Sequence, residues 1–448
     1  MIALLLAASL VAACESDPGP LPPPPSASTA VDRSLTFGVF GPEDEVAAYE
    51  SLVGVYNSLY EGAEMSVESY SSREAFMGTL RESGQVPDVF LASGRDLAWL
   101  EGQQVLQPVD SLLIERAVDF GDLYSRDAVL AFSAESRLQC MPVGISPMVI
   151  FYNTELVDFD RMAARGLPVP EDEQLTWGFE AFTAAAEFAS RPQRGTRGIH
   201  VAPTVENLAP FIYAGGGEVY DDATEPTSLA FSEEDSRSAL EELLPVLRDP
   251  RLTLSDEELG QHSPMEWFKR GKLAMIQGYR GDVPMLRQVP GLRFDIISSP
   301  SIDRSATVAE LTGMCVSADT ANTTAAADFL VHMNSGVSVR RVASEGYLVP
   351  ANLEVAFSPD FLQPGLEPDH ATVFTNTVRT IVLPPLIDDQ PEVELAVSDS
   401  LDELLTAPIL TDLEALTAQI DLESRSVLDP EGYAEELAEL EEEESESP

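Results

Sequence analysis

The first part of the chain alternates between strand-like and helix-like patterns. Residues 34–40 alternate apolar and polar positions, as a half-buried strand does, and a second alternation runs over 65–70. Between them, apolar residues recur at intervals of three and four, which predicts a helix: Tyr49, Leu52, Tyr56 and Leu59. A further helix through Phe76 and Leu80 leads to a short buried strand at 86–91. This order and spacing predict the start of an open, mainly parallel α/β sheet.

Sheets of this kind bind ligands beyond the carboxyl ends of their strands. That rule places residues 40–42 and 92–96 at the predicted binding edge. The sequence contains neither a GxGxxG after a strand nor a GxxxxGK[ST], so the usual nucleotide-binding folds lose their main support.

Composition adds size and charge to this picture. The chain has 448 residues, of which 44% are hydrophobic, enough for two or three domains with sizeable cores. Its 76 acidic and 26 basic residues give a net charge of −50, which disfavours nucleic acid and anionic membrane surfaces as partners. Only Lys269 and Lys272 are lysines. A saline habitat would account for such a surface, although a high-GC genome alone could account for the arginine bias.

The N-terminus predicts the compartment. Residues 1–13 are almost entirely apolar and end in Val11-Ala12-Ala13-Cys14. As a helix they would rise about 20 Å, too little for a hydrocarbon core of about 30 Å, so they predict a secretory signal peptide. A core strand or helix is the alternative, disfavoured because the proline-rich segment 14–33 predicts an extended linker. The run resembles a bacterial lipoprotein signal, which implies lipidation of Cys14, although no Lys or Arg precedes it.

The two remaining cysteines, Cys140 and Cys315, sit in apolar surroundings. Outside the cytoplasm a disulfide between them is permitted, and two buried free thiols are equally consistent with the sequence. The four histidines are scattered and no Cys/His cluster has metal-ligand spacing, so we expect no metal and no cofactor.

A series of motifs runs through the middle of the chain. In chain order they are PDVF at 87–90, DLAWL at 96–100, VLQPVD at 105–110, MPVG at 141–144, VIFYNTEL at 149–156, LTWGF at 175–179, IYAGGG at 212–217, FKRGKLAMIQGY at 268–279, AADFLVHM at 326–333 and EGYLVPA at 345–351. Together they resemble the sugar-type, maltose-binding-like family of ABC-importer extracellular solute-binding proteins. The resemblance spans about residues 35–385. It implies two α/β lobes, each a mainly parallel sheet flanked by helices, which close over a solute, and an ABC permease as partner.

The resemblance also implies domain boundaries. Lobe 1 is expected at 34–141 plus 284–345, and lobe 2 at 142–283 plus 346–428, followed by a solvated acidic tail at 429–448. The expected crossings between the lobes are 140–144, 278–283 and 344–346, where a hinge would absorb the closing motion.

Candidate ligand contacts are aromatic and charged. Tyr279 follows a strand at the position where the family has a cleft aromatic, and Tyr213, Phe374 and Tyr152 are further candidates. Flat rings suit the CH-rich face of a sugar. The three tryptophans, Trp99, Trp177 and Trp267, fit core positions better than stacking platforms.

Sugar hydroxyls need fixed polar partners, and two Arg–Asp pairs are candidates: Arg95 with Asp96, and Arg280 with Asp282. Other readings stay open. Asp96 could cap a helix start together with Arg95, and Arg280 could be a solvated charge at the lobe junction.

The sequence therefore predicts a monomeric, lipid-anchored, extracytoplasmic bacterial protein that binds a small solute, with a mono- or oligosaccharide favoured over polyols and other small molecules. It contains no GxSxG and no HExxH, so we expect no enzyme. A carboxylate pair for glycoside hydrolysis, or a sensor or surface-binding subunit, remains the alternative.

Overall fold

The structure is a computed structural model that describes residues 33–60, 63–170, 176–388, 390–407, 409–435 and residue 437. The predicted signal peptide, Cys14, nearly all of the linker and the end of the acidic tail lie outside the described residues.

The first sheet has five strands in the order β2-β1-β3-β11-β6. Their bounds are β1 Arg33–Phe40, β2 Ala63–Tyr70, β3 Val89–Ser93, β6 Cys140–Pro147 and β11 Ala309–Val316. β1 runs parallel to β2 and β3, whereas β11 runs antiparallel to β3 and β6. The helices of this lobe are α1 Glu43–Leu59, α2 Arg73–Ser83, α3 Leu97–Gly102, α4 Asp110–Ile114, α5 Arg126–Ala131, α13 Thr323–Met333 and α14 Gly336–Ala343.

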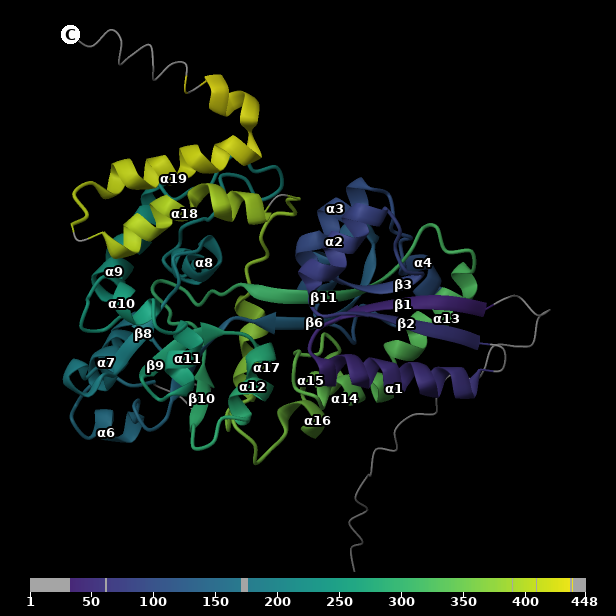
Figure 1. Cartoon of the computed structure of the whole chain (residues 1–448), viewed down its shortest axis with the longest axis horizontal. Coiled ribbons are helices and arrows are strands. Elements are labelled where there is room, and N and C mark those ends of the chain that lie inside the picture. The colour runs from purple at the N-terminus through teal and green to yellow at the C-terminus, as the bar shows by residue number, and fades with distance from the viewer. Residues whose placement is uncertain are drawn as a thin grey trace, which may run out of the picture.

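The second sheet has four strands in the order β10-β7-β9-β8. Their bounds are β7 Val149–Asn153, β8 Arg197–His200, β9 Leu273–Gly278 and β10 Phe294–Ile297. The helices around it are α6 Phe159–Ala163, α7 Phe179–Ala189, α8 Val205–Ala214, α9 Glu234–Leu247, α10 Asp256–Leu259, α11 Pro264–Lys269, α12 Val283–Arg287 and α17 Thr372–Thr377. Helices α18 Gln390–Thr406 and α19 Leu413–Leu428 pack on the same lobe, at the top left of Figure 1.

The predicted α/β, two-lobed fold is confirmed (Figure 1). Fewer strand pairs are parallel than the sequence predicts. In the second sheet only β8 and β9 pair in parallel, and the β10–β7 and β7–β9 pairs are antiparallel. The first three strands and two helices of the chain follow the predicted order, since their periodicity reports which face each element buries.

The chain passes from one sheet to the other at later residues than predicted. Residues 140–144 lie inside β6, which pairs with β11 in the first sheet, and the chain reaches the second sheet only at β7. The chain returns to the first sheet only after β10. Because β10 pairs with β7, residues 284–297 belong to the second lobe. A third connection follows residues 349–351, which still bond to β6 through Ile145 N to Val349 O at 2.9 Å. Two short helices come next, α15 Leu353–Ala356 and α16 Pro359–Leu362.

Cys140 and Cys315 form a disulfide, which decides between the two alternatives that the sequence leaves open. The two residues are directly paired on the neighbouring strands β6 and β11, and both are fully buried in the core of the first lobe. The bridge therefore closes a loop that contains the whole second sheet.

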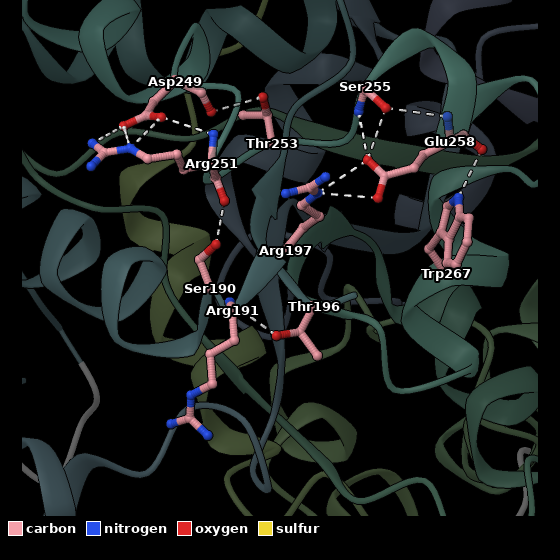
Figure 2. A network of polar contacts seen from close by, with 10 residues as sticks. All are labelled: Ser190, Arg191, Thr196, Arg197, Asp249, Arg251, Thr253, Ser255, Glu258 and Trp267. Atoms are coloured by element: carbon pink, nitrogen blue, oxygen red, sulfur yellow. Dashed lines mark hydrogen bonds and ion pairs between the residues drawn. The ribbon is translucent and has the colours of Figure 1, made fainter. Parts of the chain in front are cut away.

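A polar network supports the edge of the second sheet (Figure 2). Arg197 on β8 pairs with Glu258 at 3.0 Å, and Glu258 also forms a capping box with Ser255 at the start of α10. The indole nitrogen of Trp267 donates to the carbonyl oxygen of Glu258 at 2.9 Å. Trp267 therefore has a structural role, in line with its predicted core position.

Gly198 on β8 allows a close approach of α7, which yields a prediction. A Cβ atom at this position would lie 2.3 Å from the carbonyl oxygen of Ala186, a backbone atom that cannot rotate away. We expect Gly198→Ala to lower the free energy of unfolding by about 1–3 kcal/mol, measured by chemical denaturation. Gly54→Ala is the matched control, because this exposed position in α1 has nothing within 4 Å, and it should be neutral or slightly stabilising. Equal stability of the two variants would contradict the packing argument.

Candidate functional site

A pocket lies where the two lobes meet, and residues from both lobes line it. The first lobe contributes the end of β3, the end of α5 and the start of β11; the second contributes one face of α8 and the turn at 219–220. The segment 383–387, which leads to α18, forms a further wall. The cavity volume is about 140 Å³. This is less than the roughly 300–1,000 Å³ typical of ligand pockets, as expected for lobes that lie close together.

Arg95 and Glu206 join the lobes across this pocket. Arg95 lies on the turn η1 (Gly94–Asp96), directly after β3, and its guanidinium forms an ion pair with the Glu206 carboxylate on α8. The hydroxyl of Tyr279, at the end of β9, donates a hydrogen bond to the same carboxylate. These three residues form what we call the polar cluster, a set of donors and acceptors that suits a hydroxyl-bearing ligand.

The start of α8 is held in place by its own caps. The Thr204 side chain accepts a hydrogen bond from the backbone N–H of Asn207 at 3.2 Å. The Glu394 carboxylate on α18 accepts from the backbone N–H groups of Val205 at 3.0 Å and Glu206 at 3.1 Å. The backbone of Glu206 is therefore fixed before any ligand arrives.

Four carboxylates from both lobes interact electrostatically beside the polar cluster: Glu206 and Asp282 of the second lobe, and Glu45 and Glu310 of the first. Desolvation between the facing lobes raises the pKa of Glu310 on β11 to about 7, with Glu206 and Asp282 of the second lobe adding to the rise, while the Glu310 side chain keeps contact with solvent. Burial also raises the pKa of Glu45 to about 7, with a further contribution from Glu310. The guanidinium of Arg95 opposes this effect at Glu310 but does not cancel it.

This arrangement predicts a pH dependence. A carboxyl whose folded-state pKa lies above its ordinary 4.5 binds more protons in the folded than in the unfolded chain between pH 4.5 and about 7. The free energy of unfolding should therefore fall as the pH rises through this window. We expect Glu310→Gln to flatten the fall in melting temperature measured from pH 5 to pH 8. Glu241→Gln, on the exposed face of α9, should keep the wild-type profile, and an unchanged profile in Glu310→Gln would contradict the assignment.

Two buried tyrosines complete the lining. Tyr213 on α8 and Tyr220 are 3% and 8% exposed. Burial raises the pKa of both hydroxyls above the ordinary value, so both remain protonated and able to donate at neutral pH.

Of the residues predicted from sequence, Arg95, Tyr213 and Tyr279 meet at this site. Asp282 lies next to it, where burial raises its pKa and its carboxylate accepts from the backbone N–H of Tyr279 at 3.0 Å.

The other candidates lie elsewhere, for identifiable reasons. Asp96 is 2% exposed, receives two hydrogen bonds from Arg73 at 2.9 and 2.6 Å, and closes a capping box on η1. This is the helix-start alternative considered from sequence. Arg280 is fully buried rather than solvated, with its guanidinium 4.9 Å from the ring centroid of Phe361 and 5.7 Å from that of Phe374. Phe374 itself is fully buried in a core.

Tyr152 is also a core residue. It is 5% exposed, packs 5.2 Å from the ring of Phe159, and its hydroxyl lies 3.5 Å from the Asp295 carboxylate. Trp177 is 3% exposed in the same core, and Trp99 packs against the core of the first lobe, in line with the positions predicted for them.

Sequence reasoning missed Glu206, Glu310, Glu45 and Tyr220. Glu206 carried a weak signal, since it follows the cap Thr204 at the start of an apolar helix. Glu310 is a lone carboxylate in an apolar strand, which is itself unusual. Glu45 and Tyr220 carried no distinguishing pattern, because only the meeting of the lobes places them near the cleft.

Among the described residues no group of three or more His, Cys, Asp or Glu side chains is arranged to hold a metal ion. In the same part of the chain, no helix combines the length and apolar character needed to span a membrane.

Both the sequence and the fold of this chain are similar to those of known proteins. A sequence model of the bacterial extracellular solute-binding protein family matches residues 52–366. The structure is similar to the sugar-binding protein MalE of Xanthomonas citri, with a TM-score of 0.73 at 17% identity over 90% of this chain and 99% of that one. It is also similar to the ABC substrate-binding protein Lmo0181 of Listeria monocytogenes in complex with cycloalternan, with a TM-score of 0.72 at 18% identity over 89% of this chain and 98% of that one.

A third similar structure is the GacH receptor of Streptomyces glaucescens, solved unliganded and with acarbose, with a TM-score of 0.68 at 19% identity over 89% of this chain and 99% of that one. Comparison with curated protein sequences found no significant match. Because the family model covers well over half of the sequence, the chain belongs to the bacterial extracellular solute-binding proteins.

Proposed function

We propose that this protein captures a sugar between its two lobes outside the cytoplasm and delivers it to an ABC permease. The observation that carries the proposal is the polar cluster, in which Arg95 of one lobe pairs with Glu206 of the other at the pocket and Tyr279 donates to the same carboxylate. Sugar hydroxyls can accept from the guanidinium and donate to the carboxylate. Donors and acceptors from both lobes favour a ligand that binds the closed arrangement more tightly than the open one, as capture by closure requires.

The rest of the proposal concerns location and assembly. Lipidation at Cys14 with the proline-rich linker as a spacer would keep the binding lobes near the permease, and we propose that the protein acts as a monomer. The similar Xanthomonas citri structure is described as a sugar-binding protein, and the GacH receptor was solved in complex with acarbose, which supports a sugar as cargo. The alternative of a carbohydrate-active enzyme predicts conversion of the same ligand.

A thermal-shift screen tests this function. The full chain with Cys14→Ser, which prevents lipidation, is screened at high ionic strength against glucose, galactose, trehalose, maltose, maltotriose and glycerol. A ligand present at 100 times its dissociation constant stabilises the folded state by about 2.7 kcal/mol. We expect a saturable rise with at least one sugar, which is recovered chemically unchanged. A folded protein that responds to none would contradict sugar capture, and conversion of the sugar would contradict a binding protein.

A further inference from the structure

Most of the residues that line the pocket between the lobes are apolar. A site that binds only sugar hydroxyls does not need so much apolar surface. Its apolar lining residues include Leu130, Leu383, Pro384, Pro385, Leu386 and Ile387, together with small and branched residues of α8 and β11. The polar residues are fewer: Ser93, Arg95, Glu206, Tyr213, Tyr220 and Gln390.

Part of this apolar lining remains accessible. Leu130, on α5 of the first lobe, is 50% exposed, and Leu386 is 40% exposed. Leu383, Pro384, Pro385 and Ile387 are partly exposed beside it. We call Leu130 and residues 383–387 the apolar wall. The segment 383–387 is held in place at its start, because Val382 N donates to Thr307 O at 2.8 Å.

The apolar wall is a poor partner for a sugar ring. Its side chains offer no donor or acceptor, so hydroxyls placed against them would lose their hydrogen bonds to water without replacement. An apolar group placed there would instead remove exposed leucine, proline and isoleucine surface from water, at about 25 cal/mol per Å². The polar cluster and the apolar wall therefore favour different ends of one ligand.

We infer that the pocket binds an amphipathic glycoside, with the sugar on the polar cluster and an aromatic or aliphatic aglycone on the apolar wall. This inference rests on the proposed sugar-binding function and specifies its substrate class. The preference for an apolar group is a property of Leu130 and residues 383–387, whereas affinity for the sugar itself is a property of Arg95, Glu206 and Tyr279.

Matched glycosides test the inference. The methyl and phenyl forms of α-glucoside, β-glucoside, β-galactoside and β-maltoside are titrated calorimetrically into the full chain carrying Cys14→Ser. For at least one sugar we expect the phenyl glycoside to bind at least about tenfold more tightly than the methyl glycoside. The double variant Leu130→Ser/Leu386→Ser should reduce that ratio to about twofold or less while leaving the methyl glycoside unaffected.

Leu395→Ser is the matched control, because this leucine on α18 is 75% exposed and does not line the pocket. It should keep the wild-type ratio. Equal affinity for the methyl and phenyl forms would overturn the inference and leave sugar capture standing. A phenyl preference that survives in the double variant would overturn the assignment to the apolar wall. Failure of every glycoside to bind a folded protein would contradict sugar capture itself.

Discussion

Replacing Arg95 by alanine is expected to weaken binding of the captured sugar at least about 30-fold. Arg95 supplies positive charge beside the carboxylates of Glu206, Asp282 and Glu310, and its ion pair with Glu206 joins the lobes. Truncating one partner of a buried, hydrogen-bonded charge pair at a binding surface costs about 2–5 kcal/mol, and the lower end applies here because the Arg95 side chain is 36% exposed and its partner is 24% exposed. About 2 kcal/mol corresponds to a factor of about 30 in the dissociation constant. Titration calorimetry of the variant and the wild type with the sugar found in the screen measures the two dissociation constants.

Arg137→Ala is the matched control for this variant. Arg137 pairs with Asp110 at 2.6 Å on the same lobe but does not line the pocket. Its removal should leave the dissociation constant within about twofold, since an exposed ion pair contributes little. If Arg95→Ala bound the sugar as tightly as Arg137→Ala does, the site would lie elsewhere on the molecule.

Removing the Cys140–Cys315 disulfide is expected to lower the free energy of unfolding by about 3–5 kcal/mol. The bridge spans a sequence separation of 175 residues, for which the chain-entropy relation gives about 5 kcal/mol. At about 2–4 °C per kcal/mol, the Cys140→Ala/Cys315→Ala variant should melt on the order of 10 °C below the wild type. The melting temperature of the oxidised wild type, compared with that of the variant, measures the effect.

The wild type treated with reductant is the control for this experiment. Its melting temperature should lie close to that of the variant. Sugar affinity at room temperature should stay within about threefold, because neither cysteine lines the pocket. An unchanged melting temperature in the variant would mean that the bridge does not constrain the unfolded chain.

Local periodicity was enough to predict the start of the fold. The patterns predict strands at 34–40, 65–70 and 86–91. In the structure β1 and β2 cover the first two, β3 begins at Val89 and overlaps the third, and α1 and α2 lie between them. The rule that ligands bind at the carboxyl ends of strands placed residues 92–96 at the cleft, where Arg95 lies.

Pairings between distant segments could not be predicted in this way. Whether β10 belongs to the first or the second sheet depends on its pairing with β7, more than 140 residues earlier in the chain, and that contact leaves no local pattern. The Arg–Asp pairs were ambiguous for the same reason. Asp96 is held by Arg73 from another helix, and Arg280 is covered by Phe361 and Phe374, so the burial of each depends on tertiary contacts.

A crystal structure of the protein with the sugar from the thermal screen tests directly whether the polar cluster binds sugar. We expect an intact sugar between the lobes, with hydroxyl oxygens within hydrogen-bond distance of Arg95 or Glu206. A sugar bound outside the residues that line this pocket, or present only as cleaved product, would contradict this expectation.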